Sequence, residues 1–403
     1  MELLDRELDG RGLLPELWER IGTDSDLAAP VSIPAAHVSV SPPALVTAAA
    51  GQAGSRDDDT DMVVVPCRVH GRLRFVHVPR RVVLASGLAG LAASALPAPP
   101  AHAAAAAADI ASPVEHFAQL RRVMVQTDSL IGPRHVLPAL QPHLAHLASR
   151  RRTSRGSDAA ALLSLETRYE ELAGWLAQDI GDERTAQGHT ARALDASHIA
   201  GDTQLTAYIL GRKAQLAGDT GHPADALGLA MAARRTALPG SRLEVIALVH
   251  QAHAHAVLGD ATDALTTYDT ALTLLSRADS DGTWGSWLTE GYITTARARS
   301  LAALGKYEQA AAGFDAAIAS LPPIYRRERG VHLARSARAH AGTGNVSLAA
   351  QIGLQAVGIA AETGSARIIS QLDRLDQALV PAIKQDGVAE FHAALDQIVL
   401  HVD

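Results

Sequence analysis

The chain has 403 residues, of which about one in five is alanine, while aromatic residues make up only 3% and charged residues 20%. This composition favours close-packed helices over sheets built from β-branched and aromatic side chains, and the length allows two or three domains or one extended repeat array. The net charge of −7 excludes a chain that binds nucleic acid through overall positive charge, and a single cysteine, Cys67, excludes an internal disulfide framework.

The N-terminal part is predicted to hold little regular structure. Residues 1–22 have the pattern of short amphipathic helices. Residues 23–61 are rich in Ala, Pro, Ser and Gly and are typical of a disordered linker. Only three of the 36 basic residues are lysines, a bias that indicates a GC-rich and therefore bacterial coding sequence.

A β-hairpin is predicted next. Residues 62–69 and 72–78 alternate apolar and polar side chains on either side of the two-residue turn His70-Gly71. Pro66 interrupts the first strand, because proline cannot donate a backbone hydrogen bond. We expect this hairpin to be the only β-structure in the chain.

An apolar run at residues 82–96 follows Arg80 and Arg81 and precedes an Ala- and Pro-rich linker at 97–111. With the hairpin it forms a predicted segment, 62–96. One interpretation is a packed or linker helix, because 15 residues are short for a membrane span, which needs about 20. The other is a secretion signal or anchor, because a basic flank and an A-x-A-like end surround it.

Residues 112–403 are predicted to be one all-helical domain. Its first helix begins with Ser112 as the N-cap, Pro113 in the first turn and Glu115 as the capping-box acid.

Internal repeats organise this domain. Glycines followed by polar residues recur at spacings of 38 to 46 residues, which is the range of helix-pair repeats. They are Gly181, Gly221, Gly259, Gly305 and Gly344. An alanine stands five and twelve residues after each, and a small residue stands seven before each. Small residues let two helices cross closely, and glycine ends a helix in a left-handed conformation. The pattern predicts helix pairs stacked into a right-handed solenoid.

The repeat at residues 304–323 (LGKYEQAAAGFDAAIASLPP) resembles the tetratricopeptide repeat. The residues at signature positions are Gly305, Tyr307, Ala310, Phe314, Ala317 and Pro322. The other four copies lack one or more of the aromatic residues and the terminal proline, so the resemblance implies a divergent tetratricopeptide-like array.

A narrower resemblance covers most of the chain. Residues 3–18, 79–87, 171–182 and 362–376 resemble segments of bacterial transcriptional regulators that join a xenobiotic-response-element-type (XRE) helix-turn-helix to a C-terminal tetratricopeptide array. In that family the DNA-binding domain comes before the segment that 3–18 resembles. It is absent from this chain, so we expect no direct nucleic-acid binding.

The resemblance implies a ligand groove lined by the first helix of each pair. The positions six and thirteen residues before each repeat glycine should face it, and the predicted binding residues are Arg168, Trp175, Tyr208, Gln215, His253, Tyr292, Arg299 and Arg338. Unpaired arginines on such a face, Arg299 and Arg338 above all, would await an anion such as a peptide carboxylate. The alternative is that these are ordinary solvated or packing residues, in an array that binds along another face.

No catalytic or metal-binding pattern is found in the sequence. His250 and His253 share a helix face but His255 does not, so at most two of them could ligate one ion. Cys67 and His70 flank the hairpin turn without a second pair to complete a zinc site. We find no HExxH, GxSxG or P-loop motif, so no enzyme activity, cofactor or metal is predicted.

Two functional hypotheses remain. The first is a cytoplasmic regulatory scaffold, as a monomer or a homodimer, that binds a peptide or partner protein in the groove and no membrane. The second is a secreted or membrane-associated scaffold that uses residues 82–96 as a signal or anchor.

Overall fold

The structure is a computed structural model that describes residues 62–69, 71–79, 112–278, 285, 287–322 and 325–402. Four segments predicted from the sequence lie outside these residues, namely 1–22, 23–61, 82–96 and 97–111.

The described residues are mostly helical and form fourteen α-helices. Two helices come first, α5 (Pro113–Ile131) and α6 (Pro133–Thr153). Five helix pairs follow: α7 (Gly156–Ile180) with α8 (Glu183–Ala200), α9 (Thr203–Asp219) with α10 (Pro223–Thr236), α11 (Arg242–Leu258) with α12 (Ala261–Leu275), α13 (Glu290–Ala303) with α14 (Tyr307–Ser320), and α15 (Arg326–Gly342) with α16 (Val346–Thr363). The last helices are α17 (Ala366–Leu379), the 3-10 helix η4 (Val380–Ala382) and α18 (Val388–Asp396). None of these helices is long and apolar enough to cross a bilayer.

The five repeat glycines separate the two helices of each pair, as predicted. All five have positive φ angles, from 73° at Gly305 to 95° at Gly259, a conformation that side chains with a Cβ adopt only at a cost. At Gly181 the backbone N–H of Asp182 donates to the carbonyl of Ala177 over 2.9 Å, which satisfies an otherwise free carbonyl at the end of α7.

The predicted small residues lie where helices cross. All ten alanines after the repeat glycines are buried, with exposures between 0 and 8%. Before the first glycine, a Cβ added to Gly174 would lie 2.8 Å from the Thr190 hydroxyl oxygen. A Cβ added to Gly313 would likewise lie 2.8 Å from the Ala298 side chain. The crossings therefore leave no room for larger side chains.

Ala310→Leu should lower the free energy of unfolding by about 1–3 kcal/mol, because Ala310 is fully buried and three added carbons would force the helices apart. Ala312→Leu on the same helix is the matched control, since Ala312 is exposed. Urea unfolding followed by circular dichroism measures both, and equal midpoints for the two variants would contradict the predicted packing.

The predicted hairpin is present as β1 (Met62–Val69) and β2 (Arg72–Pro79), paired antiparallel. The expectation that it would be the only β-structure is wrong. A third strand, β3 (Leu400–Val402), pairs parallel with β1, giving the order β2-β1-β3. Three residues are too few for a periodic pattern, and the partner strand lies more than 300 residues away in the sequence, so local sequence could not reveal this pairing.

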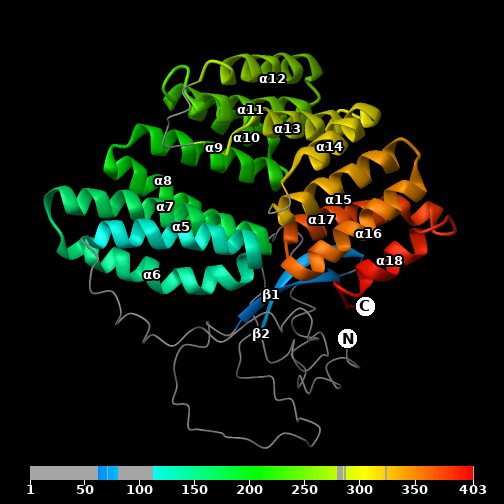
Figure 1. The fold of residues 1–403 in the computed structure, drawn as a ribbon, viewed down its shortest axis with the longest axis horizontal. Coiled ribbons are helices and arrows are strands. Elements are labelled where there is room, and N and C mark those ends of the chain that lie inside the picture. The colour runs from blue at the N-terminus through cyan, green and yellow to red at the C-terminus, as the bar shows by residue number, and fades with distance from the viewer. Residues whose placement is uncertain are drawn as a thin grey trace, which may run out of the picture.

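The hairpin bridges the beginning and the end of the helical array. The Phe75 ring lies against Gly181, where an added Cβ would be 2.5 Å from the ring. His77 Nε2 lies 3.2 Å from Asp182 Oδ2, just after α7. On the other side, Arg68 Nη2 lies 2.8 Å from an oxygen of both Asp373 and Asp376 on α17. Figure 1 shows the strands below the helices, between these two regions.

A second set of contacts joins the same two ends, and we call it the closure network: Asp128, Asp179, Arg327 and Ser365. Arg327 on α15 reaches Asp128 of α5 over 2.5 Å and Asp179 of α7 over 2.8 Å. Ser365 donates to Asp179 over 2.6 Å. The helices therefore follow an arc whose last part returns to its first, with α17 packed against α7 (Figure 1).

Candidate functional site

Five arginines on the first helices of the repeats and on α17 form what we call the arginine cluster. They are Arg212 of α9, Arg299 of α13, Arg335 and Arg338 of α15, and Arg367 of α17. Arg299 Nη2 lies 2.5 Å from Asp219 Oδ1 at the end of α9, across 80 residues of sequence. The arc of helices thus brings charges from distant repeats together.

Trp175 of α7, in the first repeat, contacts two of these arginines. The guanidinium carbons of Arg212 and Arg367 lie over its ring, 4.6 and 4.7 Å from the ring centroid. Cations so placed are attracted by the π-electrons of the indole. Arg212 also donates to the Gln178 amide oxygen over 3.1 Å, and Gln178 donates to Asp219 over 2.9 Å. Helices α7, α9 and α17 therefore meet at one aromatic ring.

Asp219 is the carboxylate at the centre of the cluster. Burial raises its pKa, but the charges of Arg299, Arg335 and Arg367 and the hydrogen bond from Arg299 outweigh that effect and hold the pKa at about 2. Asp219 is therefore ionised at every physiological pH.

Arg335 has no hydrogen bond or ion pair within the part of the chain that the structure describes. Burial lowers its pKa well below the usual value, and the positive charges of Arg299 and Arg367 lower it further, against the opposing effect of Asp219. Arg367 Nη1 is buried without a hydrogen-bond acceptor. Arg338 donates over 2.6 Å to the amide oxygen of Gln371, which carries no charge. Positive charge is thus in excess here.

The structure brings most of the predicted binding residues to this cluster. Trp175, Arg299 and Arg338 belong to the contacts above. Two further predicted residues lie near charges of the cluster: His253 near Arg299, and Tyr292 near Arg212, Arg299 and Arg367. Gln215 accepts a hydrogen bond from Arg212. Tyr208 donates over 3.1 Å to Glu171, the ion-pair partner of Arg212.

Arg168 is the exception among the predicted residues. Its carbonyl accepts a hydrogen bond from Arg121 of α5 over 3.1 Å, and its nearest charged groups are Arg121 and Asp202. Arg168 therefore lies on the part of α7 that contacts α5. The expectation that Arg299 is unpaired is also wrong, since Asp219 compensates its charge.

Sequence analysis missed several members of the site. Arg212, His250 and Arg335 stand nine residues before a repeat glycine, one turn from the positions that were used. Residues three apart share a helix face, so adding the position nine residues before each repeat glycine to the one six residues before it identifies these three residues. Arg367 has no such signal, because no repeat glycine follows α17 at the same spacing.

Three half-buried histidines surround the cluster. Burial lowers the pKa of His250 to about 4, with Arg212 and Arg299 adding to the shift and Asp219 opposing it. Burial also lowers the pKa of His253 well below 6.5; Arg299, Arg335 and His250 add to this shift and Asp219 opposes it. The pKa of His332 is lowered to about 3 by burial and by the charges of Arg335 and Arg367. All three are therefore neutral in the folded chain near pH 6. Among the described residues no three His, Cys, Asp or Glu side chains are grouped so that they could hold a metal ion.

The neutral histidines predict a pH-dependent stability. In the unfolded chain they titrate near pH 6.5, whereas the folded pKa values of His250 and His332 are about 4 and 3. Between pH 6.5 and 4 the unfolded chain binds more protons, so the free energy of unfolding should fall as the pH is lowered through this window. Urea unfolding at half-unit pH steps measures the slope. The double variant His250→Gln with His332→Gln should have a shallower slope, and an unchanged slope would contradict the prediction.

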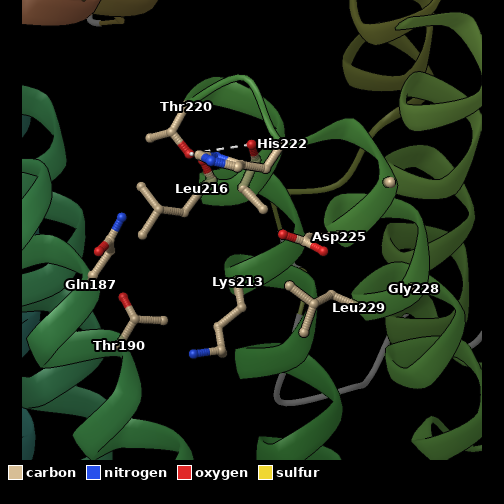
Figure 2. Close-up of a pocket in the computed structure, with 11 residues that line it drawn as sticks. Gln187, Thr190, Lys213, Leu216, Thr220, His222, Asp225, Gly228 and Leu229 are labelled. Atoms are coloured by element: carbon tan, nitrogen blue, oxygen red, sulfur yellow. Dashed lines mark hydrogen bonds between the residues drawn. The ribbon is translucent and has the colours of Figure 1, made fainter. Parts of the chain in front are cut away.

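A separate hollow of about 600 Å³ lies between α8, α9 and α10. Figure 2 shows Lys213 between Thr190 of α8 and Leu229 of α10, with Thr220 and His222 at the other end. Its walls come largely from the second helices of two neighbouring pairs, and none of the predicted binding residues lines it. Its lining includes one basic residue, Lys213, and one acidic residue, Asp225, so it has no excess of positive charge and the arginine cluster is the stronger candidate site.

No model of a known protein family matches the chain, and none of the curated proteins compared with it matches.

Proposed function

We propose that this chain is a non-catalytic regulatory binding protein that holds an anionic segment of a peptide or partner protein against the first helices of its repeats. The observation that supports this proposal best is the excess of arginine charge at the cluster, in a chain whose net charge is −7. A local excess of positive charge on a protein with net negative charge attracts anions to that site.

We also propose a repeat type for the helix pairs. Helix pairs α7 to α16, with their repeat glycines and buried crossing residues, would be divergent tetratricopeptide-like repeats in a right-handed solenoid. The relation to XRE-type regulators and a place in the cytoplasm rest on the sequence resemblance. A regulator of this kind would act through the peptide or partner protein that it binds.

A panel of ten-residue peptides that differ only in net charge tests the proposal. Acidic peptides should bind in calorimetry and basic ones should not, with affinity falling as salt rises. Arg338→Met should weaken acidic-peptide binding about tenfold, which corresponds to one hydrogen bond to a charged group. Arg297→Met is the control, because Arg297 pairs with Asp269 on α12 rather than with the cluster. Equal binding of acidic and basic peptides would contradict the proposal.

A further inference from the structure

The charges of the arginine cluster do not balance. Asp219 lies 2.5 Å from Arg299. Glu171 lies 3.4 Å from Arg212. Within the described residues, the other three arginines of the cluster have no carboxylate partner. They are Arg335, Arg338 and Arg367. Asp219 is the carboxylate whose charge acts on Arg335 and Arg367, and it is already paired with Arg299. Cations held near one another with too few carboxylates are unfavourable unless an anion joins them.

These three side chains are available to a ligand. Each is half-buried rather than fully buried, so part of its surface stays open to solvent. Beside them, His332 Nδ1 is buried without a hydrogen-bond partner. Trp175 offers an aromatic face next to Arg367. The site thus combines free hydrogen-bond donors with an apolar surface.

The number of donors distinguishes between anions. A carboxylate carries one negative charge on two oxygens, and a single arginine can satisfy both of them. A phosphate monoester carries a charge of about −1.5 to −2 near pH 7 and offers three strong acceptor oxygens. Three arginines from two helices, none of them ion-paired with a carboxylate of the described residues, match the phosphate monoester in charge and in number of contacts.

We propose that Arg335, Arg338 and Arg367 bind the phosphate group of a phosphate monoester, with Trp175 packing against the group that carries the phosphate. This inference rests on the proposed function, because it names the chemistry of the anion held at the same site. The phosphate could belong to a small organic molecule or to a phosphorylated peptide side chain, and the two sources are separated by experiment.

The test measures binding to the full chain by calorimetry at constant ionic strength. The probes are phenyl phosphate, benzoate, inorganic phosphate and a hexapeptide with one phosphoserine. Phenyl phosphate should bind about tenfold or more tightly than benzoate, since it engages additional charged donors. If the phosphoserine peptide binds more tightly than phenyl phosphate, the natural source is a peptide, and the reverse order indicates a small molecule.

The double variant Arg335→Met with Arg367→Met should weaken phenyl phosphate binding at least tenfold. Its thermal midpoint should stay the same or rise, because two cations without an ion-pair partner are removed from a cluster that has an excess of positive charge. The matched control is Arg297→Met with Arg326→Met, which removes the same charge from arginines that pair with Asp269 and Glu362, and its affinity should stay within twofold of wild type.

The two proposals fail in different ways. If phenyl phosphate and benzoate bind equally and the double variant weakens both, the phosphate assignment is wrong while the anion-binding function stands. If no phosphate probe binds and acidic peptides bind wild type and double variant alike, both proposals are wrong. Should the double variant unfold, protection of the wild-type thermal midpoint by phenyl phosphate but not by benzoate decides the same question.

Discussion

Arg327→Met is expected to lower the free energy of unfolding by about 3–5 kcal/mol, the usual effect of removing one partner from a buried ion pair. Arg327 is 3% exposed and lies between Asp128 and Asp179, which are 4% and 0% exposed. Methionine fills similar space but leaves two carboxylates buried without their cation. The loss should appear in urea unfolding at pH 7.5.

Arg326→Met is the matched control for this prediction. Arg326 is the preceding residue on the same helix, but its side chain is 58% exposed and its partner Glu362 is 53% exposed. Exposed ion pairs contribute at most about 1 kcal/mol, so this variant should unfold nearly as wild type does. If Arg327→Met were as stable as Arg326→Met, the closure network would not hold the two ends of the array together.

Arg68→Met is expected to have an effect of similar size, again about 3–5 kcal/mol. The Arg68 guanidinium joins β1 to Asp373 and Asp376 of α17 and lies 3.3 Å from Asp396 of α18. Its loss would leave carboxylates of α17 buried without a counter-charge and release the hairpin from the last helices. Backbone amides of β1 and β3 should then exchange hydrogen faster, as mass spectrometry can measure.

Arg72→Met provides the comparison for Arg68. Arg72 lies on the other strand of the hairpin, is exposed and has no ion pair among the described residues. Its replacement should change neither stability nor exchange. A result in which Arg68→Met and Arg72→Met behave alike would mean that the buried charges contribute little to holding the hairpin in place.

The sequence by itself determined the local structure of this protein. The repeat glycines ended their helices and the alanines lay at the crossings, because both requirements act within one helix pair of about 40 residues. The hairpin was predictable for the same reason, since a two-residue turn and alternating side chains specify it locally. Seven of the eight predicted binding residues, all except Arg168, came to one site because a fixed offset from each glycine marks one helix face.

Only the tertiary structure decided how the two ends of the array meet. The pairing of β1 with β3 and the contacts of Arg327 with Asp128 and Asp179 join residues that are separated by more than 140 positions. Their geometry depends on the curvature accumulated over all the helix pairs, which no local pattern encodes. The same curvature placed Arg367 over Trp175 and gave Arg299 its partner. Whether an arginine is paired depends on distance in space, and the sequence specifies only distance along the chain.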